Sequence, residues 1–267
     1  MKNKWDNDRE NDRIVAYLPV INEVEITRIE EMADSYSSDA RGKIVVYTRE
    51  EGVEKLRACA FHLEAELSGF FHGEKACILT KYASECRWQS KTAKQNQEVL
   101  SLVLRDQKTL PVEPGVHQIE LLSNEDAEEL ALLYRKVFPV YPTNIFSSDL
   151  LLQAKNADYV FAVVKDNGKI IGAASAMDSG YGSAEITDCA VQPDYRGRNL
   201  LNYLIHFLEA ELKKRGVYYT YSMTRSTSVG MNMTVKRLGY RYEGTLTNNC
   251  VISTGFEDMN VWSKSLK

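Results

Sequence analysis

The stretch Glu185–Leu201, EITDCAVQPDYRGRNLL, carries the strongest structural signal in the chain. A run typical of a strand ends at Val191, the chain turns through Pro193 and Gly197, and a helix begins at about Arg198. Such a turn exposes backbone N–H groups at the positive end of a helix dipole, which suits a diphosphate. A glycine at a strand–helix turn is more often just a turn, so the spacing alone leaves phosphate binding open.

The elements around this stretch predict an α/β sheet domain with the order β-α-α-β-β-β-α-β-α-β-β. The dipeptide Asn167-Gly168 indicates a hairpin, and Gly216 is placed to end a helix. The predicted elements are a strand at 119–122, helices at 123–136 and from 147, strands at 159–164, 169–176 and 185–191, a helix at 198–215, a strand at 218–223, a helix at 229–238, and strands at 240–246 and 258–264.

The first half of the chain gives weaker signals. We expect a frayed, polar N-terminus up to Ile14, then strands at 14–18, 43–48 and 76–80 and helices at 50–58 and 90–106. Residues 22–29 fit an edge strand or a helix through Met32, and Phe61–Leu67 fits a helix or a strand. The segment Lys108–Gly115 contains two prolines and a glycine, so we expect a smaller N-terminal α/β domain at 1–112 and a second domain at 117–267.

Composition excludes several classes of protein. The 267 residues are 44% hydrophobic and 26% charged, as in ordinary globular proteins, and the net charge of −4 gives no field that would attract nucleic acid. No window approaches the roughly 20 apolar residues of a membrane span, and the N-terminus lacks the apolar core of a secretory signal, so we expect a cytoplasmic protein. Five cysteines without a CxxC pair and four histidines predict neither a metal site nor a disulfide framework.

The element order, together with V-x-P-x-Y-R-G at 191–197, resembles the GNAT superfamily of acetyl-CoA-dependent N-acetyltransferases over residues 117–267. The resemblance implies a mixed GNAT sheet with flanking helices, acetyl-CoA as co-substrate and no metal. It implies that the strand before the motif splays from its neighbour to pair with pantetheine, and that main-chain amides after it hold the diphosphate. The positions carried over are Cys189, Ala190 and Val191 for pantetheine, Arg196, Gly197, Arg198, Asn199, Leu200 and Leu201 for the diphosphate, and Asn232 for the cofactor arm.

The sequence departs from the family pattern at two places. Asn199 and Leu201 stand where Gly and a small residue are usual, which is tolerable because main-chain groups make the contact and Asn adopts positive φ more readily than most residues. The tyrosine that many members use to protonate the departing thiolate would fall at Val235. Water, Ser228 or another tyrosine would have to supply that proton.

Three stretches are more closely similar to the β-lysine acetyltransferases within that superfamily: YRGRNL, RSTSVGMNMTVKRLGYRYEGTLTNNC and STGFEDMNVWSKSL. An N-terminal extension of about 110 residues is also similar to theirs. Within this chain, residues 56–82 resemble residues 236–264, so the N-terminal domain resembles a degenerate half-GNAT unit. That similarity favours a strand at 61–67 and a structural or dimerising role, with a possible homodimer.

Acetylation of a lysine-type amine requires a base, because the ammonium has a reference pKa of about 10.4. Glu185 and Asp188 are the candidates, and the sequence ranks them about equally. Strict alternation would place them on opposite faces of the sheet unless a bulge intervenes. The backbone N–H of Val191 is the candidate to hold the oxyanion.

A site for β-lysine also needs partners for a carboxylate and a second ammonium. Arg225, Asn248 and Asn249 are candidates for the carboxylate, while Tyr141 and Asn144 lie where GNAT members place acceptor-binding residues. We expect His206 to be a core or surface residue. Two alternatives stay open: a GNAT enzyme for another amine (a polyamine, an aminoglycoside or a protein lysine), and a non-catalytic acetyl-CoA-binding module.

Overall fold

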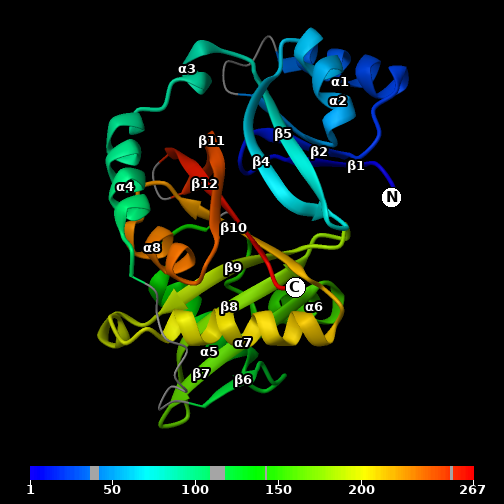
Figure 1. Cartoon of the computed structure of the whole chain (residues 1–267). Helices are drawn as coiled ribbons and strands as arrows, with labels where there is room; N and C mark the ends of the chain where they lie inside the picture. The colour runs from blue at the N-terminus through cyan, green and yellow to red at the C-terminus, as the bar shows by residue number, and fades with distance from the viewer. Residues whose placement is uncertain (37–41, 109–117, 142, 253–254) are drawn as a thin grey trace.

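The computed structural model describes residues 1–36, 42–108, 118–141, 143–252 and 255–267. Within these residues, twelve strands form one sheet in the order β1-β2-β3-β5-β4-β11-β12-β10-β9-β8-β7-β6 (Figure 1). Neighbouring strands are antiparallel except for the parallel pairs β2–β3 and β9–β10. The sheet is therefore mixed, and it runs through both halves of the chain.

The first seven elements form what we call the N-terminal unit, which ends at Tyr82. They are β1 (Lys4–Asp8), β2 (Arg13–Leu18), α1 (Glu23–Tyr36), β3 (Lys43–Thr48), α2 (Glu50–Ala58), β4 (His62–Phe71) and β5 (Glu74–Tyr82). Helices α1 and α2 cover one face of this part of the sheet (Figure 1). Their core includes Ile29 and Leu56 from the helices and Ala16, Leu18 and Val46 from the strands, all completely buried.

Two helices, α3 (Glu85–Trp88) and α4 (Ala93–Arg105), lead away from the N-terminal unit. The remaining elements form the C-terminal unit: β6 (Ile119–Leu121), α5 (Ala127–Val137), α6 (Ser148–Ala157), β7 (Tyr159–Asp166), β8 (Lys169–Asp178), β9 (Ala184–Val191), the short 3-10 helix η1 (Pro193–Tyr195), α7 (Leu200–Lys214), β10 (Tyr219–Arg225), α8 (Val229–Arg237), β11 (Arg241–Ile252) and β12 (Gly255–Ser265). Apart from η1, this order is the predicted one, and the predicted mixed α/β fold is confirmed.

Helices cover both faces of the sheet in the C-terminal unit. Helices α5 and α6 bury Leu130, Tyr134 and Leu151 against β7 and β8. On the opposite face, α7 and α8 bury an apolar stripe that includes Leu204 and Leu208. This three-layer arrangement holds β9, the strand before the Pro–Gly turn, between two helical layers (Figure 1).

Local sequence explains where these elements turn. Asn167 and Gly168 have φ values of 49° and 77°, the two positive angles that a type I′ hairpin between β7 and β8 requires. Gly216 follows α7 with a φ of 78°, the left-handed conformation that ends many helices. Both predicted turns are confirmed.

The structure corrects one expectation in the first half and decides two alternatives. Residues 4–8 are not frayed, because β1 pairs with β2 along its whole length, from Lys4–Tyr17 to Asp8–Arg13. Residues from Glu23 form helix α1, whose first turn is capped by the Asn22 side chain accepting the N–H of Glu25. Residues 62–71 form a strand, as the internal similarity favoured. From residue 109 onward, the predicted domain junction lies outside the part of the chain that the structure describes.

The two units meet where β4 lies beside β11. Gly244 of β11 pairs with Ala65 of β4, and a Cβ on Gly244 would lie 2.3 Å from the carbonyl oxygen of Glu64. Only glycine allows the two backbones to come this close. An apolar cluster then spans the seam, with Phe70 from the N-terminal unit packed against Tyr221 from the C-terminal unit.

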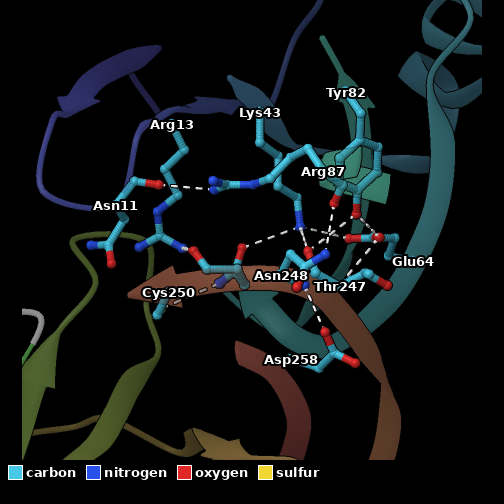
Figure 2. Close-up of polar contacts among 11 residues, drawn as sticks. Asn11, Arg13, Lys43, Glu64, Tyr82, Arg87, Thr247, Asn248, Cys250 and Asp258 are labelled. Carbon is cyan, nitrogen blue, oxygen red and sulfur yellow. Dashed lines mark hydrogen bonds and ion pairs between the residues drawn. The ribbon is translucent and has the colours of Figure 1, made fainter. Parts of the chain in front are cut away.

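A buried polar cluster, shown in Figure 2, reinforces the seam. The Lys43 ammonium of β3 lies 3.0 Å from the Glu64 carboxylate and donates to the carbonyl of Thr247 on β11 at 2.7 Å. Burial lowers the pKa of Lys43 to about 8, although Glu64 opposes the change. Nearby, Arg87 donates to the carbonyl of Asn11, and Arg13 to that of Asn249. Strands β2, β3 and β11 are thus joined by hydrogen bonds between charged and backbone groups.

Candidate functional site

Strand β9 separates from its parallel neighbour β10 after two paired positions. Thr220 and Tyr221 of β10 pair with Ala184 and Glu185 of β9, and no further pair follows in the described part of the chain. A cavity of about 1290 Å³ lies at this opening. It is lined by β9, β10, the turn before α7, the start of α8 and, from the N-terminal unit, β1, β2 and β3.

A β-bulge interrupts β9 at Asp188. The pairing with β8 shifts between Ala190–Ala173 and Thr187–Ser175, so β9 holds one extra residue, and Asp188 has a φ of 49°. The bulge breaks the strict alternation of side chains. As a result, Glu185 and Asp188 line the same cavity, which is the exception that the sequence left open.

The carboxylate of Asp188 is bound tightly by the protein. Its Oδ2 accepts a hydrogen bond from the Ser175 hydroxyl at 2.5 Å, and its backbone N–H donates to the hydroxyl oxygen of Tyr141 at 3.3 Å. Burial raises the pKa of Asp188, while hydrogen bonds from Ser175 and Tyr141 oppose the rise. Asp188 is 2% exposed, so its position suits a residue that fixes the bulge.

Glu185 has a different environment. Burial, and then the negative charge of Asp188, raise the pKa of Glu185 to about 7, while a hydrogen bond from Tyr221 and the charge of Arg13 oppose the rise. The side chain keeps partial exposure through the cavity. A carboxylate poised near neutral pH in a cavity has the property required of a general base.

The N–H of Val191 points into the opening between β9 and β10. Gln192 donates its N–H to the carbonyl of Ile171 on β8 at 2.9 Å. Along a strand of an antiparallel pair, successive residues point their N–H groups alternately toward the partner strand and away from it. Because the N–H of Gln192 points toward β8, that of the preceding residue, Val191, points away from β8. A donor fixed in this way can stabilise a developing oxyanion.

The turn before α7 offers several backbone donors at the cavity. Gly197 and Asn199 both have positive φ, 78° and 59°, and Asn199 is the N-cap of α7. Leu200 and Leu201 begin the helix, so their N–H groups have no acceptor one turn earlier within it. The helix dipole adds positive potential here, which suits a diphosphate. Asn199 thus adopts a left-handed conformation, which asparagine tolerates better than most residues. Arg196, Gly197, Asn199, Leu200 and Leu201 all line the cavity.

Of three other residues expected to contact the cofactor, one lines the cavity and two do not. Cys189 lines the cavity beside Val191, whereas Ala190 is buried on the α5 side of the sheet. Arg198 does not line the cavity, and its guanidinium lies 4.7 Å from the centre of the Tyr195 ring.

Asn232 is the clearest difference from expectation. Its Oδ1 accepts hydrogen bonds from Thr224, Asn260 and Trp262, and its Nδ2 donates to the carbonyls of Arg225 and Ser228. The side chain is fully buried and does not line the cavity. Asn232 therefore joins α8 to β10 and β12 and has no unused polar atom for a ligand.

Val235, where the family often has tyrosine, is completely buried in the core beneath α8. Ser228 does line the cavity, and its hydroxyl accepts the N–H of Met231 as the cap of α8. Six tyrosines also line the cavity: Tyr17, Tyr47, Tyr141, Tyr159, Tyr195 and Tyr221.

The residues expected at the acceptor are dispersed. Tyr141 lines the cavity, and so does Arg225, but the Arg225 guanidinium forms a double hydrogen bond with Glu257 at 2.6 and 2.7 Å. Asn144 is exposed outside the cavity. Asn248 and Asn249 are buried at the seam, where Asn248 donates to the carbonyls of Arg87 and Gln89. His206 is an exposed residue of α7.

The contribution of the N-terminal unit to this cavity was not predicted from the sequence. Arg13, Val15 and Tyr17 of β2 and Tyr47 of β3 line it, together with residues 6–11 of the β1–β2 hairpin. The alternation of RIVAYL, with Arg13, Val15 and Tyr17 on one face, was the available signal. The cavity thus combines two carboxylates, a backbone N–H donor, the N-terminus of a helix and a wall from a second unit.

Two kinds of feature are absent from the residues that the structure describes. No helix among them is both long and apolar enough to span a membrane. No group of three or more His, Cys, Asp or Glu side chains in the same residues is placed to bind a metal ion.

Comparison with known proteins gives matches of different extent. Residues 125–240 match the model of the acetyltransferase (GNAT) family. The chain is 37% identical to the N-acetyltransferase YodP of Bacillus subtilis, over 84% of this chain and 82% of that protein. It is 30% identical to the beta-lysine N(6)-acetyltransferase of Methanosarcina mazei, over 90% of this chain and 99% of that protein.

Solved structures match only part of the chain. The acetyltransferase yncA of Salmonella typhimurium, solved with its cofactor acetyl-CoA, superposes with a TM-score of 0.50 and 17% identity. The match covers 57% of this chain and 94% of yncA. More than half of the chain therefore has a fold known from a solved structure.

Proposed function

We propose that this chain, which belongs to the acetyltransferase (GNAT) family and is an N-acetyltransferase, transfers an acetyl group from acetyl-CoA to the terminal amine of β-lysine. The product would be Nε-acetyl-β-lysine, and its role that of a compatible solute in the cytoplasm. The reaction is a direct attack of the amine on the thioester.

The extent of similarity carries this proposal. The match to the beta-lysine N(6)-acetyltransferase of Methanosarcina mazei covers 90% of the chain, and thus includes most of the N-terminal unit. The family model covers only residues 125–240. Since the N-terminal unit lines the cavity, a relative that shares both units is a better guide to the acceptor than one that shares the C-terminal unit alone.

Glu185 is the proposed base. The acceptor enters as an ammonium ion, and loss of a proton to Glu185, directly or through a water molecule, frees the nitrogen lone pair. That lone pair forms the C–N bond, and the C–S bond then breaks to release the thiolate. A carboxylate with a pKa of about 7 is substantially ionised at neutral pH, so it can accept the proton.

The backbone positions the thioester. The Val191 N–H stabilises the carbonyl oxygen as negative charge develops on it. The N–H groups at the start of α7, with Arg196 beside them, hold the diphosphate of acetyl-CoA. Asp188 keeps the bulge in β9 and so aims both Glu185 and the Val191 N–H into the cavity.

The leaving thiolate needs a proton donor other than residue 235. Ser228 lines the cavity, and because its hydroxyl oxygen accepts the Met231 N–H, its hydroxyl proton is available for donation. We assign to Ser228 or to water the relay of a proton to the thiolate: the nitrogen loses its second proton as the C–S bond breaks, and the relay passes this proton on, so that the hydroxyl is restored.

Release of free thiol from acetyl-CoA tests the proposal. Purified protein is assayed with β-lysine, α-lysine, spermidine and no acceptor, with Glu185→Gln as the control for chemistry. Fast release with β-lysine alone is the expected result. Release only with another amine would keep the enzyme class and contradict the acceptor. Acetyl-CoA binding without release for any acceptor would support the binding-module alternative instead.

A further inference from the structure

We propose that the N-terminal unit forms the acceptor-selecting wall of the cavity, in which Arg13 binds the carboxylate of an amino-acid acceptor and Asp6 binds its non-reacting ammonium. This inference rests on the proposed function, because it assumes an acceptor that carries both groups.

The pleat of β1, β2 and β3 places these side chains on one face. Arg13, Val15 and Tyr17 alternate along β2, and directly opposite them on β1 lie Asp8, Asp6 and Lys4. Residues Ile14, Ala16 and Leu18 point to the other face. That second face packs on α1 and α2, which leaves the face with Arg13 and Asp6 toward the cavity.

Arg13 has donors to spare. Its Nε contacts the Asp8 carboxylate at 2.7 Å, and its Nη1 donates to the carbonyl of Asn249 at 3.0 Å. In the described part of the chain, its Nη2 makes no hydrogen bond, while the side chain lines the cavity. Asp8 is itself bound by Asn11 through three hydrogen bonds, so it holds the guanidinium in a fixed position. A fixed guanidinium with a free edge is suited to a carboxylate.

Asp6 and the two tyrosines complete the wall. Asp6 is an exposed residue of β1 that lines the cavity. Lys4, the next residue on this face, lies 6.0 Å from the centre of the Tyr17 ring and does not line the cavity. The rings of Tyr17 and Tyr47, 4.8 Å apart, form an aromatic surface against which a methylene chain can pack.

The wall and the proposed base, Glu185, line the same cavity. Burial is the main cause of the raised pKa of both Tyr17 and Tyr47, and the charge of Glu185 adds to it, while the charge of Arg13 lowers the pKa of Glu185. An acceptor whose terminal amine reaches Glu185 therefore places its other end beside β1 and β2. None of the wall residues lies within the 125–240 stretch that the family model matches, so this wall adds selectivity to the common acetyl-transfer site.

Three acceptors test the two contacts separately. β-Lysine carries both groups, 1,4-diaminopentane lacks the carboxylate, and 6-aminohexanoate lacks the second ammonium. For Arg13→Gln, we expect the ratio of kcat/KM for β-lysine over 1,4-diaminopentane to fall roughly 10- to 100-fold, mainly through KM. For Asp6→Asn, we expect a similar fall in the ratio for β-lysine over 6-aminohexanoate.

Two matched controls, Arg57→Gln and Glu51→Gln, each remove one charge at an exposed residue of α2, in the same unit. These should leave the ratios unchanged. Arg13→Lys keeps the charge but loses the planar fork, so we expect partial recovery of the ratio. Calorimetric titration with β-lysine in the presence of coenzyme A gives the affinity independently of turnover, and thermal unfolding checks that each variant is folded.

Two results would overturn the inference and can be told apart. If wild-type protein acetylates β-lysine but Arg13→Gln and Asp6→Asn change all three acceptors equally, the wall does not select and the proposed function stands. If wild-type protein acetylates only amines without a carboxylate, the inference and the proposed acceptor are both wrong.

Discussion

Two carboxylates three residues apart have different chemistry in this site. Asp188 accepts hydrogen bonds from the protein, whereas Glu185 is held in the cavity with its pKa raised to about 7. The sequence could not rank them, because the difference comes from the bulge and from Ser175, a residue of the neighbouring strand. At the scale of single residues, this difference in environment is the reason for proposing Glu185 as the base and Asp188 as a positioning residue.

Replacement of Glu185 tests that assignment. We expect Glu185→Gln to lower kcat about 10²- to 10⁴-fold, because the ammonium loses its proton acceptor. In wild-type protein kcat/KM should rise with pH through about 7, since only the ionised carboxylate is a base, and this inflection should be absent from the variant. Thiol release measured from pH 6 to pH 9 checks both.

The same variant should be more stable than wild type at pH 8. A raised pKa means that the folded state binds the proton more tightly than the unfolded state, so ionisation of Glu185 destabilises the fold as pH rises above the reference value of 4.5. Glutamine does not ionise, and its melting temperature at pH 8 should exceed that of wild type. If Glu185→Gln melts at a lower temperature than wild type, unfolding would explain its loss of activity.

We expect Asp188→Asn to keep the inflection in the pH dependence of kcat/KM and to move it to lower pH. The negative charge of Asp188 raises the pKa of Glu185, so its removal should move the inflection below 7. We expect kcat at pH 8 to fall by less than about tenfold, since Glu185 remains. Loss of the inflection in Asp188→Asn, with retention in Glu185→Gln, would make Asp188 the base.

At the scale of elements, the start of α7 depends on backbone conformation. Asn199→Val introduces a β-branched side chain at a φ of 59°, which costs about 1–2 kcal/mol and disturbs the donors of the turn. We expect KM for acetyl-CoA to rise about 5- to 30-fold with a smaller change in kcat. Asn199→Gly keeps the positive φ and should stay close to wild type. Equal effects of the two variants would show that the amide side chain, and not the backbone, makes the contact.

The elements also show how far the sequence determines the fold. In the C-terminal unit, buried stripes and turn residues such as Gly168 and Gly216 were sufficient for the element order. Strand β1 was missed because KWDND has no apolar alternation, and its structure comes from pairing with β2. Helix α1 was ambiguous because Val24 and Ile26 alternate as in a strand, whereas Ile26 and Ile29 have helical spacing. The cap that Asn22 provides is seen only in the structure.

The sequence singled out only part of the cavity lining. Turn chemistry identified the donors at α7, because such a motif lies within one short stretch of chain. Asn232 was placed at a ligand by analogy, but its partners Asn260 and Trp262 come from β12 and saturate its amide. The Arg13–Tyr17 wall depends on contacts between residues far apart in sequence, which local patterns do not encode.

For the whole molecule, the seam between the two units should control stability. Lys43 is completely buried and its partner Glu64 nearly so, and Glu64 also accepts a hydrogen bond from Tyr82. Glu64→Gln leaves the buried ammonium without a counter-ion, which we expect to cost about 3 kcal/mol of unfolding free energy. Because one sheet spans both units, denaturation followed by circular dichroism should show one transition at a lower midpoint.

A control on the same strand, β4, separates the effect of losing a buried ion pair from the effect of losing one negative charge. Glu66 pairs with Lys75 at the surface at 2.8 Å, so Glu66→Gln should change the unfolding free energy by no more than about 1 kcal/mol. Two separate transitions in Glu64→Gln, or equal effects of the two variants, would contradict a seam held by the buried pair.

The position of β12 has a consequence for biosynthesis. This strand is translated after the other eleven, yet it lies between β10 and β11 near the middle of the sheet. On the ribosome, β11 can reach β4 before β12 emerges, but β10 and β11 have no strand between them until then. A nascent chain therefore presents two open sheet edges until β12 is inserted, and a chaperone that covers such edges would raise the yield of active enzyme.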